Sequence, residues 1–198
     1  MVSLQQGEFL VKLARDSVST YLKNGQRIRP TENGFDLKKQ GVFVTLQSFP
    51  ERVLRGCIGF PYPVKRLDEA VVEMALAAAF QDPRFPPLQK GELQKVVFEI
   101  SVLTVPKALD VEAARRAEKV RVGFDGLTIE KEGCSGLLLP QVATEQGWQA
   151  EEFLRHVCLK AGLDSEVWLD ETAKVCAFQA QVFAEQKPEG SVVEKKIV

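Results

Sequence analysis

The chain has 198 residues, 45% of them hydrophobic, and its 26 basic and 27 acidic residues give a formal net charge of −1. This length allows one large domain, or two modest lobes that share a core. The balanced charge provides no general attraction to nucleic acids or anionic membranes, so we expect no nucleic-acid partner unless the basic residues cluster.

Hydrophobic periodicity predicts helices and strands in the first half of the chain. Asn24-Gly25 is a natural helix stop, and Pro83 disfavours helical geometry for the residue before it. A second helix must therefore end near Gln81. The predicted helices span 4–23 and 66–80, and the predicted strands span 41–47, 51–60 and 95–106, the first two of which we expect to pair.

The second half of the chain is predicted to hold a small antiparallel meander between helices. Asp125-Gly126 is typical of a two-residue hairpin turn, and Pro140 fits the first turn of a helix. We expect short helical structure over 111–117, a hairpin over 119–131, a third strand over 132–140, a helix over 149–162 and a last strand over 173–185.

Hairpins without regular strand–helix alternation favour an α+β fold, with a mostly antiparallel sheet and packed helices. The sequence shows no internal repeat and no convincing linker. We therefore expect a single domain over residues 1–190. Because the tail is polar and begins with proline and glycine, residues 191–198 are expected to fray.

The chain shows no targeting signal that would place it outside the cytoplasm. Its first residues lack the basic segment and apolar core of a secretory signal, and no apolar run could span a bilayer. The four cysteines are widely separated and there is one histidine, which disfavours disulfides and zinc. We predict a cytoplasmic protein with no membrane association, no metal and no cofactor.

The strand predicted over 51–60 interleaves an arginine and a cysteine with two glycines. Because successive side chains of a strand point to opposite faces, Arg55 and Cys57 share one face, about 7 Å apart. A guanidinium near the thiol would favour the thiolate, the reactive form of cysteine. The core face is predicted to hold Leu54, Gly56, Ile58 and Phe60, and the opposite face Val53, Arg55, Cys57 and Gly59.

The two glycines of this strand suit a ligand site. Gly59 would leave room beside Cys57, and both Gly56 and Gly59 would let a bound molecule approach the backbone amides. Three interpretations stay open: Cys57 packs as a small hydrophobe while Arg55 pairs with a glutamate, the two residues bind a ligand without covalent chemistry, or Cys57 is a reactive nucleophile.

Two further stretches are candidates for function. In the loop FQDPRFPPL, Arg84 could bind an anion, and Asp82 could orient it or assist catalysis by Cys57. The alternative is that Asp82 caps backbone amides of the turn and pairs with Arg84. Gln141 follows Pro140 at a predicted helix start, where amides could bind an anion.

Six segments occur in the order that is typical of AMMECR domain proteins: GVFVTL, LRGCIGFP, AAAFQDPRFPPL, FEISVLT, GLLLPQVATEQGW and EEFLRHVCLKAG. The family takes its name from a chromosomal region linked to Alport syndrome, midface hypoplasia and elliptocytosis. The resemblance runs from about residue 5 to residue 185, and its most specific marks are the hexapeptide LRGCIG and the tetrapeptide DPRF. It implies a larger lobe built from both chain ends and a smaller inserted lobe. It also implies an association with Memo-like and radical-SAM proteins in prokaryotes.

These observations leave open whether the chain is an enzyme. Our leading hypothesis is a binding or adaptor module with a small pocket lined by Arg55, Cys57 and Arg84. Its ligand would be a small anion or a partner protein of the Memo-like or radical-SAM kind. The alternative is an enzyme that uses Cys57 as nucleophile or group carrier, and a second alternative is an RNA-linked role.

Overall fold

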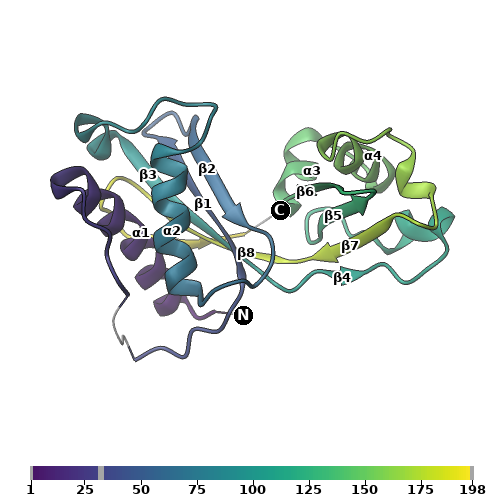
Figure 1. Cartoon of the computed structure of the whole chain (residues 1–198), viewed down its shortest axis with the longest axis horizontal. Coiled ribbons are helices and arrows are strands. Elements are labelled where there is room, and N and C mark those ends of the chain that lie inside the picture. The colour runs from purple at the N-terminus through teal and green to yellow at the C-terminus, as the bar shows by residue number, and fades with distance from the viewer. Residues whose placement is uncertain (1, 31–33, 197–198) are drawn as a thin grey trace. The chain divides into compact units, whose positions relative to one another are not determined.

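The structure is a computed structural model that describes residues 2–30 and 34–196 (Figure 1). The chain forms two compact units. Unit 1 runs from the N-terminus to Leu103 and resumes at Gln181–Lys195, and unit 2 is inserted as Thr104–Ala180. The predicted α+β fold is confirmed, as is a larger lobe built from both chain ends with a smaller inserted lobe.

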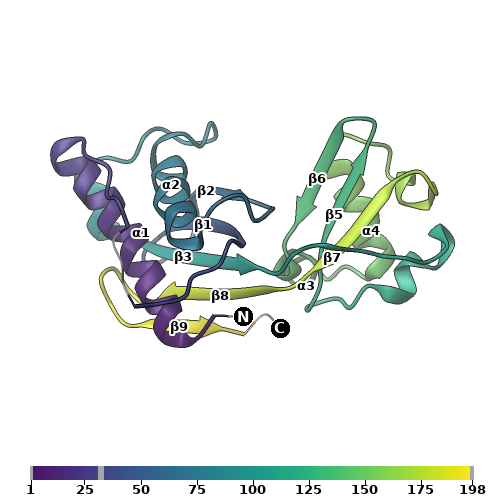
Figure 2. The ribbon, with the colours of Figure 1, turned by 60° about the horizontal axis from the view of Figure 1, so that its bottom comes forward.

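Unit 1 is a five-stranded sheet with two helices, α1 and α2, packed on it (Figures 1 and 2). The strand order is β2-β1-β3-β8-β9, so β2 lies at one edge. The strand β1 pairs antiparallel with both β2 and β3. The elements are α1 (Leu4–Asn24), β1 (Gly41–Ser48), β2 (Leu54–Phe60), α2 (Leu67–Phe80), the 3-10 helix η1 (Lys90–Lys95), β3 (Val96–Leu103), β8 (Ala180–Glu185) and β9 (Val192–Lys195).

Local signals in the sequence set the ends of both helices. Ser3 and Gln6 form a capping box that begins α1, and Gly25 ends it with a left-handed φ of 73°. The second helix ends at Phe80, as Pro83 requires, and Gln81 is its C-cap. Both helices cover the same face of the sheet, where the buried core includes Val42, Val44, Leu46, Phe98, Ile100 and Val102.

The end of the chain differs from its prediction. Residues 192–195, expected to fray, form β9 and pair antiparallel with β8, from Val182 opposite Lys195 to Glu185 opposite Val192 (Figure 2). The alternation in SVVEK fits a strand, and pairing with β8 satisfies its backbone groups. Residues 197 and 198 lie outside the described part.

Unit 2 contains a four-stranded sheet of order β4-β7-β5-β6 with helices around a second core. This core centres on Leu127, Ile129, Phe153, Leu154 and Val157. The elements are β4 (Lys107–Ala108), the 3-10 helix η2 (Ala113–Lys119), β5 (Gly126–Lys131), β6 (Cys134–Leu138), α3 (Pro140–Gln146), α4 (Ala150–Lys160), the 3-10 helix η3 (Val167–Leu169) and β7 (Lys174–Phe178).

The hairpin predicted over 119–131 is wrong in its position. The hairpin of unit 2 joins β5 to β6, and its turn is Glu132-Gly133, with φ of 52° and 83°. The Asp125 side chain instead accepts hydrogen bonds from the backbone and guanidinium of Arg121, which closes a compact turn before β5. Gly126 serves packing, because a Cβ there would lie 2.4 Å from the Phe178 ring.

The last predicted strand, 173–185, is divided between the two units. Gln179 separates β7, which belongs to the sheet of unit 2, from β8 in the sheet of unit 1. Its side-chain amide donates to Asp125, and its backbone N–H donates to Thr104 Oγ1. The Gln179 carbonyl also accepts a hydrogen bond from the Thr104 backbone N–H at 2.9 Å, so both backbone groups of Gln179 are bonded to Thr104.

Candidate functional site

The residues around Cys57 form a polar cluster at the β2 edge of the unit 1 sheet. Thr45 of β1 lies directly opposite Cys57 of β2, and its hydroxyl donates to the Cys57 sulfur at 3.2 Å. Burial raises the pKa of the Cys57 thiol, and this effect outweighs the lowering by the Thr45 bond and the Arg84 charge. The thiol is therefore protonated at neutral pH. We call Thr45, Cys57, Asp82, Arg84 and Glu99 the Cys57 cluster.

Asp82 and Arg84 close the open edge of β2. The Cys57 backbone N–H donates to Asp82 Oδ2 at 2.9 Å, and Arg84 Nη2 donates to the Cys57 carbonyl at 3.2 Å. The carboxylate and guanidinium thus replace the two groups that a neighbouring strand would supply, which protects a sheet edge from unwanted pairing. Asp82 is buried, whereas 51% of the Arg84 side chain is exposed.

Asp82 and Arg84 also bind each other directly. Arg84 donates from Nε to Oδ1 at 2.9 Å, from Nη2 to Oδ2 at 2.7 Å, and from its backbone N–H to Oδ1. The guanidinium bonds lower the pKa of the Asp82 carboxyl to about 2. The local role that the sequence offered as the alternative, a capped turn with an Asp82–Arg84 pair, is what the structure contains.

Arg55 does not act on the Cys57 thiol. Its Nε and Nη2 bind both carboxylate oxygens of Glu92 at 2.9 and 3.2 Å, and Nη2 also donates to the carbonyl of Pro86. The positive charge that lowers the thiol pKa comes from Arg84 instead. The strand register shifts at this point, since Leu54 and Gly56 lie opposite consecutive residues of β1 and leave Arg55 as a bulge. The predicted activation of Cys57 by Arg55 is therefore wrong.

The two glycines of β2 serve packing. A Cβ at Gly56 would lie 2.1 Å from the carbonyl oxygen of Ala78, so this glycine lets α2 approach the sheet. At Gly59, a Cβ would lie 2.4 Å from the Phe43 ring. The space that the sequence assigned to a ligand beside Gly59 is therefore filled by Phe43. The alternation itself holds, since Ile58 and Phe60 pack on the core and Leu54, beside the bulge, is exposed.

Two residues of this region were missed by the sequence analysis. Glu99 of β3 lies opposite Thr45, is 6% exposed, and accepts a hydrogen bond from Lys195 Nζ at 2.7 Å. Ser101, two residues further on, is 1% exposed, and its hydroxyl has no hydrogen-bond partner among the described residues. The sequence signal that could have identified both residues is the presence of a glutamate and a serine within the otherwise apolar strand VVFEISVL.

Gln141 belongs to unit 2, whereas Cys57 belongs to unit 1. It occupies the first turn of α3 after Pro140, as predicted. Its side-chain oxygen is buried and has no hydrogen-bond partner within the described residues. Because α3 has only seven residues, its N-terminus gives little dipole for binding an anion.

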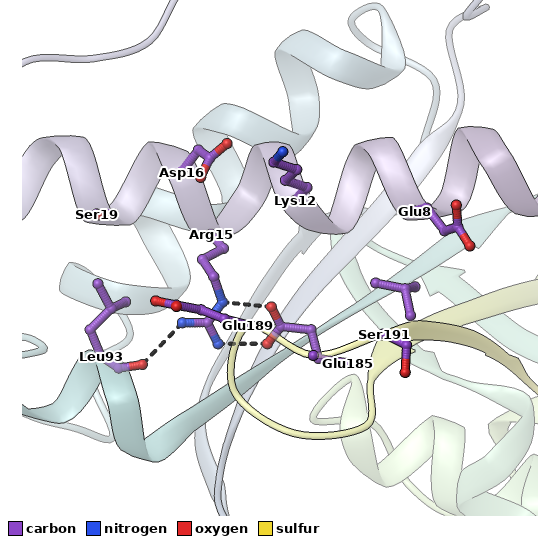
Figure 3. Close-up of a pocket in the computed structure, with 11 residues that line it drawn as sticks. Glu8, Lys12, Arg15, Asp16, Ser19, Leu93, Glu185, Glu189 and Ser191 are labelled. Atoms are coloured by element: carbon purple, nitrogen blue, oxygen red, sulfur yellow. Dashed lines mark hydrogen bonds and ion pairs between the residues drawn. The ribbon is translucent and has the colours of Figure 1, made fainter.

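A cavity of about 600 Å³ lies elsewhere in unit 1, beside α1 (Figure 3). Its floor is the buried pair Arg15–Glu185, in which Nε and Nη2 bind the two carboxylate oxygens at 2.5 and 2.6 Å. Arg15 also donates to the carbonyls of Leu93 and Val96, and Glu185 also accepts from the backbone N–H of Phe98. These bonds tie α1, β3 and β8 together, so we interpret the pair as structural.

Comparison with known proteins places the whole chain in one family. The family model AMMECR1 matches residues 11–183. Protein MK0488 of Methanopyrus kandleri is 47% identical, with 99% of this chain and 96% of that protein covered. Protein MJ0810 of Methanocaldococcus jannaschii is 43% identical, over 100% and 99% of the two chains.

A solved structure shows the same fold. The crystal structure of the uncharacterized protein PH0010 from Pyrococcus horikoshii matches with a TM-score of 0.93 and 47% identity, and 97% of each chain is covered. None of the helices in the described residues is long and apolar enough to cross a membrane. The motifs LRGCIG and DPRF therefore lie within a chain that belongs to the AMMECR1 family.

Proposed function

We propose that the chain is a binding module and that its Cys57 cluster recognises an anionic group, a carboxylate or a phosphate. The observation that carries the proposal is the state of Arg84. Its guanidinium is fixed by Asp82 and by the Cys57 carbonyl, its side chain is half exposed, and its Nη1 has no hydrogen-bond partner among the described residues.

A fixed and partly unused guanidinium is well suited to bind an oxyanion. Side-chain entropy is a main cost of using an arginine, and the bonds of Arg84 to Asp82 and Cys57 have already restricted this side chain. The remaining Nη1 N–H groups can donate charge-assisted hydrogen bonds to a carboxylate or phosphate oxygen. Since Asp82 is ionised at all physiological pH values, this arrangement persists at neutral pH.

The alternative in which Cys57 is a nucleophile is disfavoured by its surroundings. A nucleophilic cysteine needs a lowered pKa, whereas burial raises the pKa of Cys57. We propose that the thiol contributes shape and a weak hydrogen bond to the site. Memo-like and radical-SAM proteins, which the family resemblance implies as partners, are candidate suppliers of the anionic group, either as a side chain or as a shared small molecule.

The test is a titration with inorganic phosphate and with acetate, followed by backbone amide NMR shifts. We expect the amides of Cys57 and Arg84 to shift, and we expect Arg84→Gln to weaken binding about fivefold or more, the effect of one charged contact of about 1 kcal/mol. Arg115→Gln is the matched control, because Arg115 is another exposed arginine that pairs with a carboxylate, Glu118. Equal binding by the wild type and Arg84→Gln would refute the proposal.

A further inference from the structure

The polar row of the unit 1 sheet continues beyond Cys57 to Glu99. We propose that Glu99 is a second, acidic pole of the same site, so that the ligand carries an amine at least about 10 Å from its anionic group. This inference rests on the proposed function, because it takes Arg84 as the pole that binds the anion. It narrows the ligand from any anion to a zwitterion with separated charges.

The register of three strands sets the minimum distance between the two poles. Cys57, Thr45 and Glu99 lie opposite one another on β2, β1 and β3, so their side chains emerge from the same face. Neighbouring strands lie about 4.8 Å apart, which places Glu99 about 10 Å from Cys57. Arg84 is bonded to the Cys57 carbonyl at the outer edge of β2.

Both charged groups lie close enough to affect the same thiol. The Arg84 guanidinium lowers the pKa of Cys57, and the carboxylates of Glu99 and Asp82 raise it. The strand register places Cys57 between Arg84, at the outer edge of β2, and Glu99 on β3. A zwitterion that spans the row would pass over Cys57 and Thr45, whose hydroxyl and thiol already bond to each other.

Ser101 lacks the hydrogen-bond partner that a buried polar group normally has, and Glu99 uses only one of its carboxylate oxygens. The carboxylate of Glu99 is 8% exposed, and it accepts one bond, at Oε2; Oε1 has no partner within the described residues. An ionised carboxylate can accept about four hydrogen bonds. The hydroxyl of Ser101, on the same face of β3, is also unpartnered. A protonated amine carries three N–H donors, which could bond to Oε1 of Glu99 and to the hydroxyl oxygen of Ser101.

Lys195 shows which kind of group fits at Glu99. In the free protein, its ammonium group forms an ion pair with the Glu99 carboxylate, yet 47% of the Lys195 side chain is exposed. It extends from β9, the last strand of the chain. A ligand amine that displaced the lysine would keep a positive charge at Glu99, so the buried carboxylate would not be left without a counter-charge. Lys195 is then an internal competitor of the ligand.

The test compares ω-aminocaprylate with caprylate, two carboxylates of the same chain length that differ by the terminal amine. Affinities would come from amide NMR shifts of Thr45, Cys57 and Glu99. We expect the amino compound to bind the wild type about fivefold more tightly. Glu99→Gln should remove this preference, and Lys195→Met should increase it.

Matched controls separate this site from other charged surfaces. Glu8→Gln alters an exposed carboxylate of the α1 cavity, and Lys187→Met removes an exposed lysine from the β8–β9 turn. Neither should change the preference. Thermal unfolding would show whether Glu99→Gln is folded, and Lys195→Met provides a second variant at an exposed side chain.

The possible outcomes distinguish the two proposals. If both compounds bind the wild type equally and Arg84→Gln weakens both, the acidic pole is refuted while the anion site stands. If Glu99→Gln keeps the amine preference, or Lys195→Met lowers it, the acidic pole is also refuted. If neither compound binds, the anion site fails and the inference fails with it.

Discussion

Two of the arginine–carboxylate pairs in unit 1, Arg15–Glu185 and Arg84–Asp82, differ in their surroundings. Arg15 and Glu185 are both buried, with side chains 7% and 4% exposed, and both are surrounded by further hydrogen bonds. In the other pair, Asp82 is equally buried but Arg84 is half exposed and keeps unused donors. The difference indicates that the first pair holds the fold together and the second can contact another molecule.

The comparison also shows why a cavity is a poor guide to function here. The cavity of about 600 Å³ lies over the Arg15–Glu185 pair, whose polar groups are bonded to α1, β3 and β8. Beside the Cys57 cluster, the buried hydroxyl of Ser101 has no hydrogen-bond partner among the described residues, and Arg84 keeps unused donors. The number of unused hydrogen-bonding groups therefore distinguishes a binding site from a structural ion pair better than cavity volume does.

The largest expected effect is at the buried pair. Glu185→Gln leaves the Arg15 guanidinium buried without its counter-charge, and we expect the free energy of unfolding to fall by about 3–5 kcal/mol. Urea unfolding followed by circular dichroism measures this loss. Phosphate binding at the Cys57 cluster should not change in the protein that remains folded.

Glu194→Gln is the matched control for this change. Glu194 lies on β9, is exposed, and accepts a hydrogen bond from Gln181. Its substitution should change stability by less than about 0.5 kcal/mol. If the two variants lose the same stability, the pair Arg15–Glu185 is not the structural element that we describe. Recovery in a double Arg15→Met, Glu185→Met variant would instead support it.

A smaller loss is expected at the second pair, because Arg84 is in contact with solvent. The pKa of Asp82 is about 2 in the folded protein, below its ordinary value of 3.8, so this carboxylate stabilises the folded state above pH 4. That contribution disappears as the pH falls from about 4 to about 2. After allowance for solvent screening, we expect Asp82→Asn to cost about 1–2 kcal/mol at pH 7.

The measurement is unfolding free energy as a function of pH for the wild type and Asp82→Asn. The difference between them should be constant from pH 7 to pH 5 and should shrink below pH 4. Asp164→Asn, at an exposed turn position of unit 2, is the control for the removal of one carboxylate from the chain. A difference that persists unchanged down to pH 2 would contradict the assigned role of Asp82.

Much of the fold was predictable because local signals agree with the tertiary structure. The helix stop at Gly25, the break imposed by Pro83 and the proline that begins α3 fix element boundaries by backbone geometry. The misplaced hairpin has a different cause. Asp125-Gly126 has the residues of a tight turn, but the packing of Phe178 on Gly126 and the bonds of Asp125 to Arg121 override that preference.

The candidate site was predictable only in part. The LRGCIG and DPRF segments lie together, because Asp82 and Arg84 bind the Cys57 backbone. Strand alternation could not reveal that Arg55 pairs with Glu92, since a bulge and a loop 31 to 37 residues away determine that contact. The position of Glu99 in the same row as Cys57 depends on the order of strands in the sheet, which puts β1 between β2 and β3. No local pattern contains that order.

The smallest energetic effect concerns the thiol, and it sharpens the difference between a structural and a reactive cysteine. Cys57 is partly buried with a raised pKa, whereas Cys134 is exposed at the start of β6. Alkylation requires the thiolate and access, so iodoacetamide should modify Cys134 well before Cys57 at pH 7.5. Peptide mass spectrometry at a series of times measures both rates in one sample. Faster modification of Cys57 than of Cys134 would overturn the protonated-thiol assignment and restore the nucleophile hypothesis.

Cys57→Ser should lower stability by less than about 1 kcal/mol and leave phosphate binding intact, because the anion is held by Arg84 and the serine hydroxyl can still bond to Thr45.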